Sequence, residues 1–98
     1  MPSHMNIVRF KPKPGHGEAL IKAHNDFDFS TWDGCLSCKI VTYDGGMCSV
    51  LEWESADHMQ AAMSQMIAFL DSIRDQLDAF SPELGVTDPI SGPVTAFL

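Results

Sequence analysis

The sequence predicts an α+β fold of the ferredoxin-like, split β-α-β type (β-α-β-β-α-β), with a four-stranded antiparallel sheet. Three observations support this prediction. Gly45 and Gly46 separate two runs rich in Val, Ile, Leu and Cys, which is typical of a β-hairpin. Apolar residues recur every three or four positions before and after the hairpin, which predicts a helix on each side. A short apolar segment near each end completes the order, and both helices then cover one face of the sheet.

The N-terminal part is predicted to begin with an appendage. Residues 1–4 are expected to be disordered or derived from a tag, with a single domain over 5–98, because Ser-His-Met directly before a strand resembles a tag scar. Residues 5–11 are predicted as a strand that ends at prolines, which cannot donate to a ladder. Residues 17–29 are predicted as a helix, because one helical face collects Leu20, Ala23, His24 and Phe27.

The hairpin over residues 35–54 has two conceivable registers. If Gly45 and Gly46 form the loop, Lys39 faces Glu52, and β-branched residues also face each other. If the loop is Asp44 and Gly45, Lys39 faces Val50. Cross-strand pairs of opposite charge and of β-branched side chains are stabilising, so the first register is preferred.

Both faces of this hairpin are apolar. The preferred register places Leu36, Cys38, Ile40, Leu51 and Trp53 on one face and Cys35, Val41, Tyr43, Cys48 and Val50 on the other. A sheet with one wet face should alternate more cleanly. Two helices cover only one face, so a partner subunit is expected to cover the other, most simply in a C2 homodimer.

The second helical segment is predicted over residues 56–80, with Ser55 as its N-cap and a possible break near Ser64. Pro82 ends it. Residues 90–98 are predicted as the last strand, and Pro93 within it is typical of an edge position.

Composition excludes several classes of function. The 98 residues carry a net charge of −7 with only six Lys and Arg, which disfavours nucleic acid and anionic membranes as partners. No apolar run approaches the roughly 20 residues of a membrane span. Cys35 and Cys38 are expected on opposite strand faces, so the three cysteines are expected to be free thiols in the cytoplasm, without a metal site.

A resemblance to a known family rests on the junction between the hairpin and the second helix. The sequence Leu51-Glu52-Trp53-Glu54-Ser55-Ala56-Asp57, followed by a Met- and Ala-rich helix with Ile67-Ala68-Phe69-Leu70, resembles antibiotic biosynthesis monooxygenase-like domains of the dimeric α/β barrel superfamily. The resemblance covers about residues 5–98. It implies a homodimer with packed sheets and a pocket between sheet and helices. Members include cofactor-independent monooxygenases acting on polycyclic aromatic compounds, haem-degrading enzymes and quinol-related enzymes.

The chain departs from the haem-degrading members of that family. Those members resemble one another in an Asn on the first strand and in a Trp and an iron-binding His on the second helix. Here Asn6 is expected to lie too early in its strand, residues 56–80 contain no Trp, and their only His is His58 in the first turn. Haem degradation is therefore disfavoured.

His24 is the candidate catalytic residue, because a neutral imidazole facing the sheet could hydrogen-bond a phenol or quinone oxygen or accept a proton. The alternative is a core histidine that is merely satisfied. Five further side chains are candidates for binding an apolar or aromatic ligand: Trp53, Trp32, Phe27, Met63 and Met66. Core packing is the alternative for Trp53, and the helical spacing of the two methionines favours core packing for them.

These expectations favour a monooxygenase or related oxidative enzyme that acts without a cofactor or metal on a small aromatic or quinone-like molecule. His24 would act as a base or hydrogen-bond partner, Trp53 would orient the ring, and Ile40, Leu51 and Trp53 would form the floor of the pocket. A homodimeric, non-catalytic module that binds a small molecule is the alternative, and a structural dimerisation domain is a third interpretation.

Overall fold

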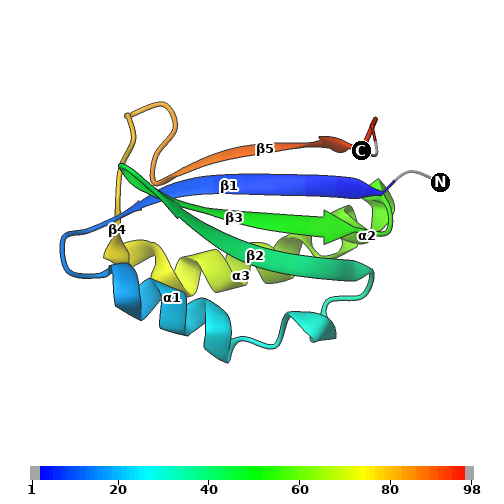
Figure 1. The fold of residues 1–98 in the computed structure, drawn as a ribbon, viewed down its shortest axis with the longest axis horizontal. Coiled ribbons are helices and arrows are strands. Elements are labelled where there is room, and N and C mark those ends of the chain that lie inside the picture. Colours follow the sequence, from blue (N-terminus) through cyan, green and yellow to red (C-terminus); the bar gives the residue numbers. More distant parts are fainter. Residues whose placement is uncertain (1–2, 97–98) are drawn as a thin grey trace.

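The protein is an antiparallel sheet covered on one face by helices (Figure 1). A computed structural model describes residues 3–96. The elements, in chain order, are β1 (His4–Pro12), α1 (Gly17–Asp26), η1 (Phe29–Thr31), β2 (Cys35–Tyr43), β3 (Gly46–Trp53), α2 (Ala56–Ala61), α3 (Met63–Ile73), η2 (Arg74–Gln76), β4 (Leu77–Asp78) and β5 (Thr87–Pro93).

The sheet confirms the predicted ferredoxin-like topology and adds one short strand. β3 lies between β2 and β1, and β5 pairs antiparallel with the other side of β1 over His4–Phe10. The additional strand, β4, has two residues and pairs with Lys11 and Pro12 at the end of β1. β1 begins at His4, one residue before the predicted start. Met1 and Pro2 lie outside the described residues, so a tag origin of residues 1–4 stays a prediction.

The preferred hairpin register is wrong, and the alternative register is the one observed. Tyr43 pairs with Gly46 and Lys39 with Val50, so the loop is Asp44 and Gly45. Gly45 has φ +108, which only glycine adopts easily. Gly46 belongs to β3, and a Cβ there would lie 2.8 Å from the carbonyl oxygen of Phe10. Close packing of this backbone against β1 therefore requires the second glycine.

A β-bulge at the start of β2 overturns the expected orientation of one cysteine. The register shifts between Cys35 and Ser37, so that Cys35 pairs with Trp53 and Cys38 with Leu51. The extra residue, Leu36, is 55% exposed, whereas both thiols pack on the helix side of the sheet. Cys35 and Cys38 thus share a face.

The first helix is shorter than predicted. α1 ends at Asp26, and Phe27 is already extended. The carboxylate of Asp28 accepts a hydrogen bond from the backbone N–H of Ser30, which stabilises η1 in place of another helical turn. This change of direction brings Phe27 and Phe29 under the sheet.

The second helical segment, for which the sequence left a break near Ser64 possible, is broken at Ala62. Ser55 is confirmed as the N-cap, because its hydroxyl accepts a hydrogen bond from the N–H of His58 at 3.2 Å. The prediction that the helix reaches Phe80 is wrong. α3 ends at Ile73. Leu77 fits the helical period but lies in β4, where it pairs with Pro12 of β1.

β5 runs from Thr87 to Pro93, so it begins three residues before the predicted start at Ile90, and it is an edge strand as Pro93 indicated. Residues 97 and 98 of the predicted strand lie outside the described residues. The N–H of Val94 donates to the carbonyl of Ser3 at 2.8 Å. Because N–H groups alternate in direction along a strand, the odd-numbered positions of β5 point away from β1. Two of these positions are Pro89 and Pro93, which have no N–H to offer.

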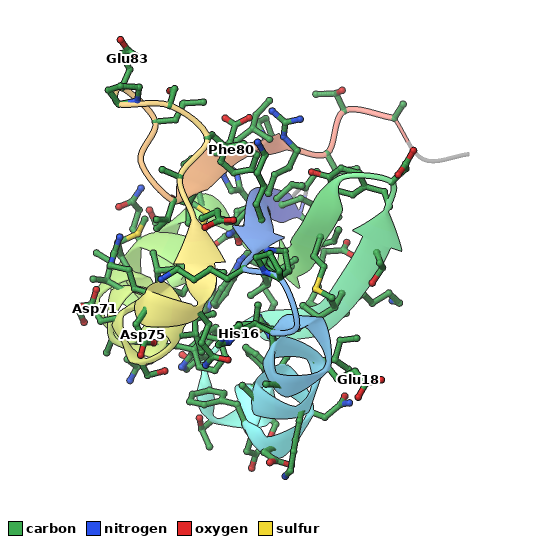
Figure 2. The ribbon with its side chains drawn as sticks, turned by 90° about the vertical axis from the view of Figure 1, so that its left-hand side faces the viewer. His16, Glu18, Asp71, Asp75, Phe80 and Glu83 are labelled. Atoms are coloured by element: carbon green, nitrogen blue, oxygen red, sulfur yellow. The ribbon has the colours of Figure 1, made fainter. Side chains whose placement is uncertain are left out.

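The core has two parts between sheet and helices. One is centred on Phe10, Leu20 and Met47 and the other on Trp53 and Met59. The acidic side chains Glu18, Asp71, Asp75 and Glu83 point outward at the periphery (Figure 2). Within residues 3–96, no helix has the length and apolar character that crossing a membrane requires.

Candidate functional site

A cavity of ≈ 420 Å³, called here the inner cavity, lies between the sheet and α2 and α3. Its lining is mainly apolar and aromatic, with a few polar groups, as expected of a small-molecule site. The sheet contributes Asn6, Val8, Phe10, Cys38, Ser49 and Leu51, and the helices contribute Met59, Met63, Met66, Ile67, Phe69 and Leu70. Ile67 on α3 and Pro89 on β5 also line it and are both exposed, so it opens to solvent between these elements.

His24 projects from α1 into this space and is held firmly. Its Nδ1 lies 2.8 Å from the carbonyl oxygen of Leu20, one helical turn earlier. Its ring is nearly parallel to those of Phe10 and Phe29, with centroids 5.8 and 6.3 Å away, and it makes an edge contact with Phe69 at 4.9 Å between centroids. Three aromatic neighbours and one hydrogen bond therefore fix the imidazole.

This environment keeps His24 neutral. Burial lowers the pKa of His24 below its ordinary value of 6.5, and the hydrogen bond to the Leu20 carbonyl only partly opposes this effect. A carbonyl can only accept, so Nδ1 carries the proton in the neutral ring and Nε2 carries the lone pair. Nε2 is thus the atom that can accept a hydrogen bond or a proton from a ligand.

Asn6 supplies the second oriented polar group. Its side-chain oxygen accepts a hydrogen bond of 2.7 Å from the indole N–H of Trp53, and both residues are buried. Within residues 3–96 the amide nitrogen of Asn6 has no protein acceptor. Since Asn6 lines the inner cavity, its NH₂ group is available to donate to a ligand.

An aromatic cluster closes the end of the inner cavity near η1. Phe69 of α3 meets the ring of Phe27 at 4.9 Å, and Phe27 meets that of Trp32 at 5.2 Å.

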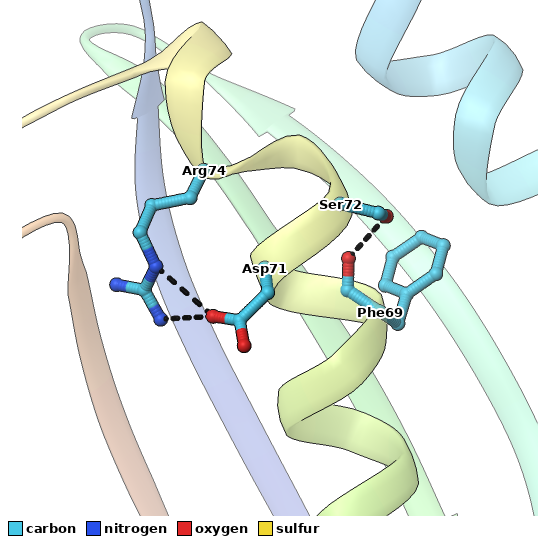
Figure 3. A network of polar contacts seen from close by, with 4 residues as sticks. All are labelled: Phe69, Asp71, Ser72 and Arg74. Carbon is cyan, nitrogen blue, oxygen red and sulfur yellow. Dashed lines mark hydrogen bonds and ion pairs between the residues drawn. The ribbon is translucent and has the colours of Figure 1, made fainter.

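Ser72 and the Asp71–Arg74 ion pair lie at the C-terminal end of α3 (Figure 3), where the Ser72 hydroxyl donates to the Phe69 carbonyl. These local bonds stabilise the helical turn that carries Phe69.

A second space, called here the outer cavity, has a volume of ≈ 390 Å³ and lies between α1 and the edge strand β2. Its lining includes the polar residues Asn25 and Thr42, both exposed. Three side chains line both cavities and form the wall between them: His24, Phe29 and Cys38. Burial raises the pKa of the Cys38 thiol to about 11, and the nearby Cys35 adds to this effect, so the thiol in the wall is protonated.

The sequence-predicted residues fall into three places. His24, Trp32, Met63 and Met66 line the inner cavity, whereas Phe27 lines the outer cavity. Trp53 lines neither, because it is fully buried and stacked on Trp32 at 6.1 Å. The prediction that Ile40, Leu51 and Trp53 form the floor of the pocket is therefore wrong for two of them. Trp53 lines neither cavity, and Ile40 lines only the outer cavity.

Sequence reasoning also misplaced Asn6. It was expected too early in β1, but β1 extends to His4 and Asn6 pairs with Leu51 on the helix-facing side. The signal was available: Asn6, Val8 and Phe10 alternate along the strand, so a buried Phe10 places Asn6 inside as well. Ser49 was missed in the same way between Met47 and Leu51.

The two cavities lack a preformed metal centre. Among residues 3–96, no three His, Cys, Asp or Glu side chains come close enough to hold an ion. Three cysteines are present as free thiols.

Solved structures with this architecture come from several bacteria. A candidate antibiotic biosynthesis monooxygenase from Chloroflexus aurantiacus J-10-fl superposes with a TM-score of 0.73 at 16% identity, covering 98% of this chain and 96% of the other. SnoaB from Streptomyces nogalater, a cofactor-independent oxygenase, gives a TM-score of 0.62 at 12% identity, covering 98% and 94%. The heme-degrading protein Rv3592 from Mycobacterium tuberculosis gives 0.65 at 17%, covering 99% and 96%. The chain has the antibiotic biosynthesis monooxygenase-like fold.

This monooxygenase-like fold is shared across nearly the full length of each protein, so the likeness is one of whole domains. At these identities it concerns the fold alone. No protein-family model matches the sequence, and no curated protein matches it significantly.

Proposed function

We propose that the protein is a cofactor-independent oxygenase or related oxidative enzyme that acts on a small aromatic hydroxy compound or quinol in the inner cavity. One observation carries the proposal: His24, whose Nδ1 is tied to the Leu20 carbonyl so that the lone pair is on Nε2, lines an aromatic cavity. A base in such a site can favour the anion of a bound phenol.

The chemistry requires two polar contacts. Nε2 of His24 takes the proton of the ligand hydroxyl, and the amide NH₂ of Asn6 can donate to an oxygen of the resulting anion. The electron-rich anion then reacts with O₂. With anthrone, for example, Nε2 takes the hydroxyl proton of the anthranol tautomer, and the ring methylene becomes a carbonyl. One oxygen atom of O₂ enters the product anthraquinone. The other leaves as water with the remaining methylene hydrogen and one proton that the peroxide anion takes from solvent, which balances the proton lost to His24. The ligand supplies all the electrons, so no redox cofactor is needed.

The residues of α2 and α3 favour this chemistry over haem degradation. Neither helix has a Trp, and His58, their only His, lies outside the lining of the inner cavity. His58 Nδ1 is instead 2.7 Å from the hydroxyl of Ser55. SnoaB, which has the same fold, is an oxygenase of the cofactor-independent kind.

The functional unit in this proposal is a homodimer formed through the outer sheet face. Val41 and Tyr43 on β2 are 47% and 37% exposed there, beside the half-buried Ile7 and Val50. The prolines of β5 make pairing through its free edge unfavourable, so the apolar face is the better surface for a second copy.

Aerobic oxidation of anthrone, followed by oxygen consumption and by absorbance of anthraquinone, tests the proposed activity. We expect turnover by the wild type and a loss of about 100-fold or more in His24→Ala, the usual contribution of a general base. His16→Ala is the matched control, since His16 lines neither cavity. Full turnover by His24→Ala would refute the role of His24. Saturable binding of anthrone without oxidation would identify the protein as a binding module instead.

A further inference from the structure

We infer that the outer cavity is the route by which water reaches His24 and carries away the proton that this residue takes from a ligand. The inference rests on the proposed function for the source of that proton. The route itself follows from the position of one imidazole that borders two separate spaces.

When a ligand fills the inner cavity, the outer cavity is the space from which water can still reach His24. The imidazole is only 7% exposed, and the rings of Phe10, Phe29 and Phe69 pack around it. A flat aromatic molecule that fills the inner cavity also excludes water from that side. The outer cavity borders the same ring and remains open between α1 and β2.

The lining of the outer cavity suits water. Asn25 from α1 and Thr42 from β2 can each donate and accept hydrogen bonds, and both are exposed. A site needs such polar partners before it holds water. The opposite mouth, between α3 and β5, is bordered by Ile67 and Pro89 and suits an apolar ligand.

The proton balance involves two transfers at one atom. The ligand O–H bond breaks and an N–H bond forms at Nε2, which gives a phenolate and an imidazolium. The imidazolium then loses the same proton to a water molecule in the outer cavity, and the neutral ring is restored. Nδ1 takes no part, because its hydrogen stays bonded to the Leu20 carbonyl. The only other ionisable side chain among the lining residues of both cavities is Cys38.

Hydrogen–deuterium exchange at the imidazole Cε1 of each histidine, measured by mass spectrometry across a pH series, tests the route without any ligand. The variants of the outer cavity are made in an Ile67→Trp background, because water in the empty inner cavity would otherwise also reach His24. The pH series separates a change in pKa from a change in access. Thr42→Trp and Asn25→Trp fill the outer cavity from opposite walls, and Thr42→Val and Asn25→Leu are their matched controls. Ile67→Trp narrows the opposite mouth, and His16 is the internal reference.

We expect each outer-cavity Trp variant to slow the plateau exchange of His24 by at least about threefold, with His16 and both controls unchanged. Ile67→Trp should retain more than about half of the wild-type rate. Exchange in both outer-cavity Trp variants that is as fast as in Ile67→Trp itself, or loss of exchange in Ile67→Trp alone, would overturn the route. Because Thr42 and Asn25 lie on different elements, one variant serves if the other does not fold. Failure of anthrone to react would instead overturn the proposed function and leave this result standing.

Discussion

The indole N–H of Trp53 on β3 donates a 2.7 Å hydrogen bond to the side-chain oxygen of Asn6 on the neighbouring β1. Both groups are buried, so each satisfies the other away from water. The bond also fixes which end of the Asn6 amide faces the inner cavity. Trp53 therefore supports the site without touching the space a ligand would occupy.

Removal of the acceptor should be costly. We expect Asn6→Ala to lower the free energy of unfolding by about 1–3 kcal/mol, because it leaves the buried indole N–H unpaired. In a Trp53→Phe background the same change should cost about 1 kcal/mol less. Urea denaturation of the four proteins measures this cycle, and equal costs in both backgrounds would show that the bond contributes nothing.

His24 should make stability depend on pH. Its pKa is lower in the folded chain than in the unfolded one, so the unfolded chain binds more protons once the pH falls below about 6.5. Above that pH, His24 is neutral in both states and does not lower the free energy of unfolding. As the pH falls from about 6.5 to the lowered pKa, the free energy of unfolding decreases, with a slope of at most about 1.4 kcal/mol per pH unit. Urea denaturation between about pH 5 and pH 7 should therefore give a flatter profile for His24→Gln. A profile parallel to the wild type would contradict the buried, neutral state.

The ring of Phe69 should be central to the aromatic cluster, since it contacts His24, Phe27 and Phe29 with centroids 4.9 to 5.7 Å away. We expect Phe69→Ala to lower the free energy of unfolding by about 2–4 kcal/mol. Phe69→Leu keeps most of the volume and should cost less than about 1.5 kcal/mol. Thermal and urea unfolding provide the comparison, and similar costs for both variants would mean that the ring fills no defined space.

Gly46 and Gly92 form a matched pair of strand glycines. A methyl group at Gly46 would meet the Phe10 carbonyl at 2.8 Å, whereas nothing lies within 4 Å of one at Gly92. Gly46→Ala should therefore lower the free energy of unfolding by about 1–3 kcal/mol and Gly92→Ala by less than about 0.5 kcal/mol. Equal effects in a denaturant titration would argue against the observed hairpin register.

The proposed dimer can be tested with one charge on the outer sheet face. Val41→Lys should weaken self-association by at least about tenfold, because it places an unpaired ammonium in the apolar surface. Ile21→Lys on α1 is the control, since Ile21 is 38% exposed on the opposite side of the sheet. Sedimentation equilibrium gives both dissociation constants, and a monomeric wild type would refute the dimer.

The sequence contained enough information for the order of the main elements but not for the hairpin register. Turn glycines and helical periodicity are local signals, and they predicted the four long strands and both helical segments but not β4 or the short turns η1 and η2. A register slip of two residues keeps each side chain on its own face, so the apolar pattern could not distinguish the two loops. Leu77 shows the same limit in a helix, because its spacing fits α3 although it pairs with Pro12.

The site could be predicted only in part. His24 was found because one helical face collects it with Leu20, and both are buried. Two features of the site depend on contacts between strands. One is the bulge at Leu36, which turns Cys35 inward. The other is that Asn6, rather than Trp53, lines the inner cavity. Such contacts leave no periodic trace in a single chain.

The two prolines of β5 have a consequence for the lifetime of the protein at high concentration. An open strand edge is a template on which other chains can add and grow into fibrils. Two of the backbone nitrogens that point outward along this edge belong to prolines and carry no hydrogen. The hydrogen-bond ladder with an incoming strand would therefore be interrupted. The border at β5 thus resists uncontrolled polymerisation, while the apolar sheet face remains available for the proposed dimer.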